Sequence, residues 1–216
     1  MHCGSSIVLD FGREYCGGVR VLTYHADGKC RLRIRFGESL GEACAELREK
    51  GASNDHSLRD FETEPMRYSD MQFGQTAYRF IRFDMLAGTS LKIKKISGVF
   101  EYFDVPAQGS FRYNDERLNE IFDTASYTLK LCVHNGMVWD GAKRDRLVWI
   151  GDMHPETLGL LCLYGEQECI KNSLRFVRNQ TTLPAFMNRI PSYSLWWIAT
   201  IFLCENVKFR FFAFYI

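Results

Sequence analysis

The sequence predicts an α+β chain of two domains, an antiparallel β-sandwich followed by a helical domain. Hydrophobic residues recur with a period of two before about residue 105, and with a period close to 3.6 after Pro106. The length of 216 residues leaves room for two modest domains. Strands first and helices afterwards favour separate domains, so we expect a β domain over residues 1–105 and a helical domain over residues 106–216.

The first half of the chain contains several segments that alternate between charge and hydrophobe or are rich in β-branched and aromatic residues. The clearest is Arg31–Phe36, where strict alternation places Leu32, Ile34 and Phe36 on one buried face and three arginines on the other. Short strands separated by turns are typical of an antiparallel sandwich. Further strands are expected at Ser6–Phe11, Gly18–Tyr24, Gln75–Phe83 and Leu91–Phe103.

Two connections between the expected strands also show recognisable features. Ala26–Lys29 contains an Asp-Gly pair between two expected strands, and because this pair tolerates positive φ, it predicts a hairpin turn. The segment Gly37–Asp70 is long, charged and poorly patterned, and Ala43–Lys50 is its only helical stretch. A connection of this length usually has a function or packs on a neighbour.

Three helices are expected after Pro106. Asn114 predicts the cap of the first, whose apolar positions recur until Asn135-Gly136 ends it. A second helix is expected to begin near Pro155 and is apolar nearly all round, which predicts burial within a helical array. Glu168–Arg178 is expected to form the third helix, with one apolar face.

Composition and charge exclude several classes of protein. Hydrophobic residues make up 46% and charged residues 25%, which excludes a disordered or collagen-like chain. With 27 Lys and Arg against 26 Asp and Glu, the net charge of +1 gives no reason to expect a nucleic-acid or membrane-surface partner. The eight cysteines form no CxxC pair, so neither a zinc site nor a thioredoxin motif is expected. The N-terminus shows no secretory signal, which leaves the compartment open.

The C-terminal stretch Leu195–Ile216 is unusually aromatic and contains no Gly, Pro or Asp. A membrane span needs about 20 apolar residues, but charged residues begin at Glu205, so a transmembrane helix is not expected. We interpret the stretch as a core element without its partners or as out-of-frame translation.

The densest polar cluster in the sequence connects the first two expected helices. Residues 139–154 contain three aspartates, three cations and two tryptophans. One interpretation is a solvated loop with ion pairs. The other is a sugar site, because aromatic rings stack on the apolar face of a pyranose while carboxylates and Arg bind its hydroxyl groups. Asp145 with Asp140 or Asp152 could also form a like-charge cluster that raises the pKa of one acid.

Residues 140–152, with the sequence DGAKRDRLVWIGD, resemble the active-site signature of the bacterial α-L-rhamnosidases of glycoside hydrolase family 78. Upstream, residues 9–14, 35–38 and 73–80 resemble the β-sandwich that precedes the catalytic barrel in this family. Residues 179–197 continue the likeness into the barrel. The resemblance implies an antiparallel β-sandwich followed by the first helices of an (α/α)6 toroid, the six-hairpin glycosidase domain.

The resemblance also implies a role for each matching residue. Asp145 would be the general acid that protonates the glycosidic oxygen. Asp140 and Asp152 would bind rhamnose hydroxyl groups, Arg144 would support them, and Trp149 would form the wall under the methyl group of the sugar. The expected partner is a rhamnose-containing glycan or glycoside. No metal or cofactor is implied, since glycoside hydrolysis needs only two carboxylates and water.

The family inverts configuration, so a second carboxylate must activate water, and in the family this base is a Glu far downstream. We therefore expect this chain to be a fragment of an α-L-rhamnosidase that lacks the general base and has no appreciable activity alone. The twelve helices of a complete toroid need well over ~200 residues. The alternative function is a non-catalytic carbohydrate-binding or structural β-sandwich module.

Overall fold

The computed structural model describes residues 1–51 and 58–206. The chain divides into two compact units: Met1–Glu101 with Ala142–Asp145, and Tyr102–Gly141 with the described residues from Arg146 onward. Each unit has its own hydrophobic core. Residues 207–216, which hold most of the aromatic side chains noted near the C-terminus, lie outside the described residues.

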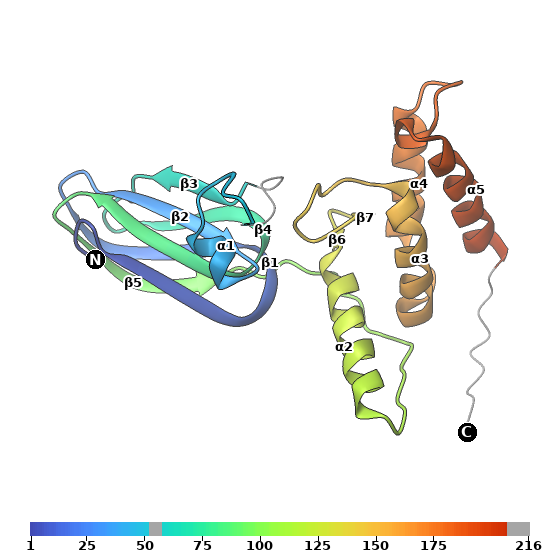
Figure 1. Cartoon of the computed structure of the whole chain (residues 1–216), viewed down its shortest axis with the longest axis horizontal. Coiled ribbons are helices and arrows are strands. Elements are labelled where there is room, and N and C mark those ends of the chain that lie inside the picture. The colour runs from blue at the N-terminus through green and yellow to red at the C-terminus, as the bar shows by residue number, and fades with distance from the viewer. Residues whose placement is uncertain (52–57, 207–216) are drawn as a thin grey trace. The chain divides into compact units, whose positions relative to one another are not determined.

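The first unit is built on one five-stranded antiparallel sheet (Figure 1). Before two bulges in β1, this strand pairs with the second half of β4, and after them it pairs with β5 and the first half of β4. The strand order is β3-β2-β4-β1-β5. The strands are β1 (Ser6–Asp27), β2 (Arg31–Gly37), β3 (Asp60–Thr63), β4 (Asp70–Ala87) and β5 (Ser90–Gly98).

A single hydrophobic core takes side chains from both halves of this sheet. Val19 and Val21, from the second half of β1, lie in the same cluster as Leu32, Ile34 and Phe36 from β2. The last three side chains are completely buried, so the alternation predicted for β2 is confirmed. The antiparallel β part of the predicted α+β class is thereby confirmed, and its strands form one continuous hydrogen-bonded sheet.

The arginines of β2 occupy the opposite face, but that face is not uniformly solvated. Arg35 is buried and donates to the carboxylate of Asp84 at 2.8 Å and to the carbonyl of Cys44 at 3.2 Å. A buried guanidinium needs such partners because the cost of removing it from water is otherwise not offset.

The predicted hairpin at Ala26–Lys29 is wrong. A turn forms there, and Gly28 has the positive φ, 74°, that the Asp-Gly pair predicts. However, β1 and β2 do not pair with each other, because the second half of β4 lies between them and bonds to both. The two strands expected at residues 6–11 and 18–24 are parts of the single strand β1.

The long connection after β2 contains two elements. The helix expected at Ala43–Lys50 forms earlier, as α1 (Leu40–Cys44), because the Ser39 hydroxyl accepts from the Glu42 N–H at 3.1 Å and caps its start. Strand β3 was not expected, and it pairs with the outer edge of β2.

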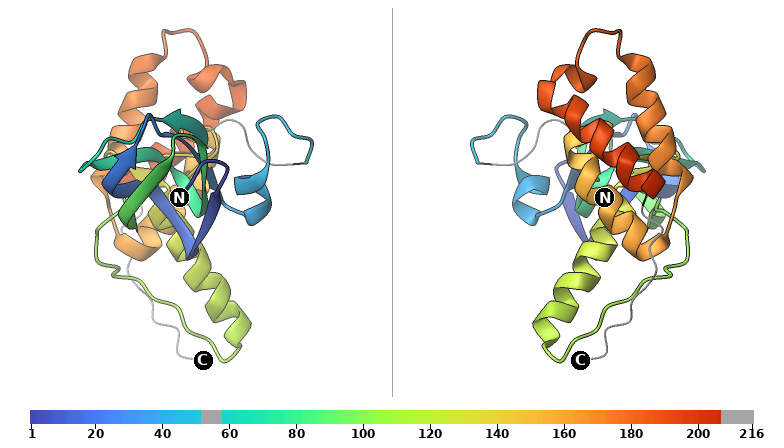
Figure 2. Two further views of the ribbon diagram at one scale, coloured as in Figure 1. Left: turned by 90° about the vertical axis from the view of Figure 1, so that its left-hand side faces the viewer. Right: turned by 90° about the vertical axis from the view of Figure 1, so that its right-hand side faces the viewer.

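The second unit is a set of helices with a two-stranded ribbon, and α5 runs beside α3 (Figure 2). Helix α3 also contacts α2 and α4, so its predicted burial within a helical array is confirmed. The elements are α2 (Glu116–Leu131), β6 (Val133–His134), β7 (Met137–Val138), α3 (Ile150–Tyr164), α4 (Glu168–Gln180), the 3-10 turn η1 (Met187–Arg189) and α5 (Pro191–Asn206).

Two helix starts differ from expectation. The cap of α2 is Asp115 rather than Asn114, because the Asp115 carboxylate accepts from the Arg117 N–H at 2.9 Å. Helix α3 begins at Ile150, and Pro155 lies inside it instead of near its first residue. None of the helices within residues 1–51 and 58–206 is long and apolar enough to cross a membrane.

Candidate active site

The polar segment singled out from the sequence connects β7 to α3 as a closed loop. The Asp140 N–H donates to the Leu147 carbonyl at 3.0 Å, and the Leu147 N–H donates to the Asp140 carboxylate at 2.7 Å. This reciprocal pair of hydrogen bonds fixes the neck of the loop. Within the loop, Ala142–Asp145 belongs to the first unit and the residues on either side belong to the second.

The structure therefore divides the five predicted site residues between the two units. Arg144 and Asp145 belong to the first unit, whereas Asp140, Trp149 and Asp152 belong to the second. The contacts within each group show what that group can do chemically.

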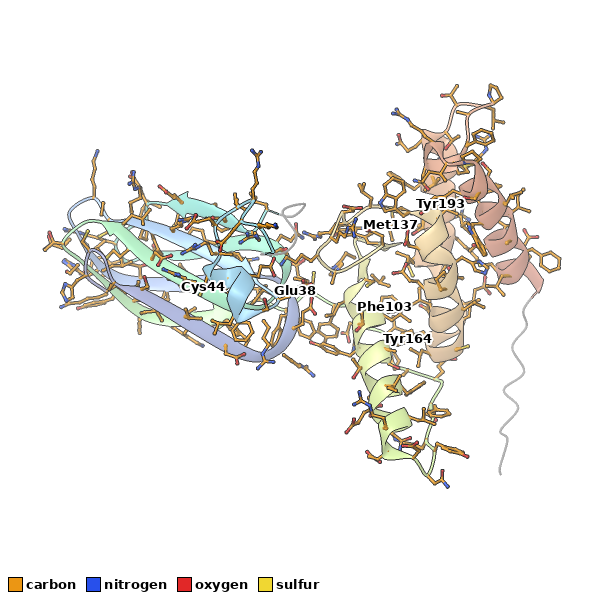
Figure 3. All side chains as sticks on the ribbon, viewed as in Figure 1. Glu38, Cys44, Phe103, Met137, Tyr164 and Tyr193 are labelled. Carbon is orange, nitrogen blue, oxygen red and sulfur yellow. The ribbon has the colours of Figure 1, made fainter. Side chains whose placement is uncertain are left out.

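In the second unit, Trp149 and Asp152 lie at the start of α3 and both contact Tyr193. The Tyr193 hydroxyl donates to the Asp152 carboxylate at 3.3 Å, and its ring meets the Trp149 ring edge to face at 6.0 Å between centroids. Tyr193 comes from α5 (labelled in Figure 3). The aromatic face and the carboxylate are thus held by a common neighbour.

Gly151 makes this contact possible. A Cβ atom at this position would lie 2.4 Å from a carbon of the Tyr193 ring, closer than two such atoms can approach. Because glycine has no side chain, the ring can lie directly against the first turn of α3. The glycine of the sequence motif therefore has a packing role.

Glu156 is a site residue that the sequence analysis missed. It lies one helical turn after Asp152 on α3, so the two carboxyl groups share a helix face. Its Oε2 atom is buried and accepts no hydrogen bond from the described residues. The spacing of four residues between the two acids was the signal in the sequence.

Burial and two neighbouring carboxylates raise the pKa of Glu156. Desolvation has the largest effect, followed by the charges of Asp152 and Asp140, and together they raise the pKa from 4.5 to about 8. The like-charge cluster expected around Asp145 is therefore found around Glu156, whose carboxyl group is protonated at neutral pH. A neutral carboxyl group can donate a hydrogen bond that a carboxylate cannot.

In the first unit, Asp145 is the neighbour of Arg144. The Arg144 Nε atom lies 3.9 Å from the Asp145 carboxylate, and the arginine side chain is largely exposed. Asp145 has a positive φ of 50° and Arg146 one of 54°, values that non-glycine residues seldom adopt. Strained backbone of this kind clusters at functional sites.

A groove in the second unit does not coincide with this site. This groove, of about 1060 Å³, runs along α4 and α5, where Leu174, Arg178 and Trp197 are among the residues that line it. None of the five predicted site residues lines this groove. Within residues 1–51 and 58–206, no cluster of His, Cys, Asp or Glu side chains could hold a metal ion.

Residues 106–211 match the family described as bacterial α-L-rhamnosidase six-hairpin glycosidase domain. Over these residues, just under half of its length, the chain is similar to the six-hairpin glycosidase domain of the α-L-rhamnosidases. No curated protein matches the chain.

Solved structures agree with the α+β fold. A rhamnosidase from Klebsiella oxytoca with rhamnose bound has a TM-score of 0.77 at 19% identity, over 95% of this chain and 45% of that one. A family 78 rhamnosidase of Bacillus sp. GL1 has a TM-score of 0.71 at 19% identity, over 90% of this chain and 21% of that one. This chain thus spans less than half the length of these two proteins.

Proposed function

We propose that this chain is part of an inverting α-L-rhamnosidase that releases terminal α-L-rhamnose from a glycan or glycoside. The observation that carries the proposal is the match of residues 106–211 to the rhamnosidase glycosidase domain, with the complete acid, arginine and tryptophan pattern of residues 140–152 inside it. In this proposal residues 1–105 form the β-sandwich domain and residues 106–216 the N-terminal part of the (α/α)6 catalytic domain.

Each side chain in the proposed site has a role that suits its surroundings. Asp140 and Asp152 bind sugar hydroxyl groups, because ionised carboxylates are strong acceptors. Trp149 stacks on the apolar side of the ring and methyl group, and its contact with Tyr193 supports this orientation. Arg144 supports the acids, and Asp145 donates the proton to the glycosidic oxygen. Protonated Glu156 limits the negative charge of the cluster.

An inverting reaction needs a second carboxylate about 6.5–9.5 Å from the acid, on the opposite face of the sugar, where it activates the attacking water. In the proposed assignment that base is a glutamate outside the signature segment, residues 140–152. We expect residues 1–216 to bind the sugar without appreciable turnover in the absence of that base. Turnover of an aryl rhamnoside by this chain, abolished by Asp145→Asn, would overturn this part of the proposal.

Binding of methyl α-L-rhamnoside, followed by NMR chemical-shift changes, tests the proposal directly. We expect the unaltered chain to bind, Asp152→Asn to weaken binding by about tenfold or more through loss of a charged acceptor, and Asp123→Asn to leave it unchanged. Asp123 is an exposed carboxylate on α2 and therefore a matched control. Absence of binding would refute the proposed site. Binding confined to residues 1–101 would instead favour the alternative, a carbohydrate-binding β module.

A further inference from the structure

Lys143 lies in the middle of the signature segment, yet it is not a solvated cation. Its side chain is only 1% exposed, and its Nζ atom contacts the Glu42 carboxylate, which is equally buried. A second carboxylate, Glu38 (labelled in Figure 3), lies 3.7 Å from the same nitrogen. All three residues belong to the first unit.

The Glu42 carboxylate that receives Lys143 is held in a fixed position. The Glu42 Oε2 atom accepts from the Glu38 backbone N–H at 2.8 Å. The backbone N–H of Glu42 donates to the Ser39 hydroxyl at 3.1 Å. The completely buried Arg59 donates to the Glu42 carbonyl at 3.1 Å, which ties α1 to the strand region of the unit. Lys143 therefore binds to a rigid acceptor.

The backbone next to Lys143 is held as well. The Cys16 thiol donates to the Ala142 carbonyl at 3.5 Å, which joins the start of the segment to β1. The unfavourable backbone conformation at Asp145 lies two residues after Lys143. Strain of this kind persists only where surrounding contacts over-determine the chain.

We propose that Lys143 is a positioning residue whose buried ion pair with Glu42 anchors Ala142–Asp145 to the first unit and thereby sets the backbone of Asp145. The link to catalysis rests on the proposed function, because Asp145 is the acid only in that assignment. The anchoring of Ala142–Asp145 by the ion pair does not depend on the proposed function.

Removal of one partner alone would leave the other charge buried and unpaired. That unpaired charge would destabilise the fold whether or not the ion pair anchors the segment. The informative variant is therefore the neutral pair Lys143→Met with Glu42→Gln, which removes both charges and keeps the side-chain volumes similar. Arg59, whose Nε atom lies 3.8 Å from the same carboxylate, keeps its hydrogen bonds to the carbonyls of Glu42, Ala45 and Glu46 in this variant. Lys143→Arg preserves the charge and is expected to restore the anchor. Lys92→Met is the matched control, because Lys92 is an exposed lysine on β5 of the same unit.

Hydrogen–deuterium exchange followed by mass spectrometry measures how readily the anchored segment Ala142–Asp145 opens. In the neutral pair we expect exchange in the peptide covering residues 142–146 to rise about tenfold or more, because local opening no longer breaks an ion pair. Lys143→Arg and Lys92→Met should exchange as the unaltered chain does. Unchanged exchange in the neutral pair, or a rise spread evenly over β1 to β5, would overturn the proposal.

If the neutral pair does not fold, Glu38→Gln replaces it. Glu38 is the outer partner of Lys143 and is 44% exposed, so its loss should leave the fold intact. We then expect a smaller rise, about two- to threefold, in the same peptide. No rise in that peptide would equally overturn the proposal.

Binding of methyl α-L-rhamnoside separates this inference from the proposed function. If the unaltered chain does not bind the sugar, the proposed function fails whatever the exchange result. If the sugar binds, the neutral pair should weaken binding about tenfold and Lys143→Arg should restore it, while the unfolding midpoint of the second unit stays in place. Unchanged sugar affinity in the neutral pair would overturn the positioning role.

Discussion

The raised pKa of Glu156 makes the stability of the helical unit depend on pH in a predictable direction. The folded unit holds a proton on Glu156 up to about pH 8, whereas a glutamate in the unfolded chain releases it near 4.5. Between these values the folded state binds more protons than the unfolded state. The free energy of unfolding must therefore fall as the pH rises through this window.

The structure sets the size of this effect. A pKa difference between 4.5 and about 8 corresponds, at about 1.4 kcal/mol per pKa unit, to about 5 kcal/mol at most. Part of the residue remains in contact with solvent, and solvent screening reduces the contribution to roughly 2–3 kcal/mol. Glu156→Gln cannot ionise, so its free energy of unfolding should lack this dependence.

Urea unfolding followed by tryptophan fluorescence measures this difference in the helical unit alone, because all four tryptophans lie outside the first unit. We expect the stability of Glu156→Gln relative to the unaltered chain to rise by roughly 2–3 kcal/mol between pH 5 and pH 9. Groups that titrate in both proteins cancel in this comparison. Glu120→Gln, an exposed position on α2, is the control and should show no such trend. A flat difference, or one of opposite sign, would refute the burial argument.

Three further predictions concern other parts of the chain. Gly151→Ala should push the Tyr193 ring away from α3 and cost about 1–3 kcal/mol, seen as a lower urea midpoint and altered tryptophan emission; an unchanged spectrum would contradict the close packing. Ile34→Ala should cost the first unit about 2–5 kcal/mol in thermal unfolding by circular dichroism, whereas Leu58→Ala, at an exposed position, should cost little; equal losses would contradict the core assignment. Burial and the neighbouring glutamates raise the pKa of Glu14 to about 7. The first unit should therefore lose stability between about pH 5 and pH 7.5, and a carboxyl NMR titration with a midpoint near 4.5 would contradict this.

Local pattern in the sequence determined the elements whose structure depends on near neighbours. The alternation of Arg31–Phe36 predicts a strand with one buried face because side chains of a strand alternate in direction, whatever the partner strands are. The 3.6-residue period predicts α2 and α4 for the same kind of reason. The signature of residues 140–152 was also visible, because a motif is contiguous by definition.

Only the tertiary structure decided which strands pair and which charges are buried. The turn at Gly28 has the local geometry of a hairpin, yet β4 lies between the strands it connects, because pairing depends on segments about 50 residues away. Lys143 and Arg144 are adjacent cations in the sequence, but one is buried against Glu42 and the other is exposed. Burial, and with it the raised pKa of Glu156, depends on which distant side chains surround a group, and no local pattern encodes that.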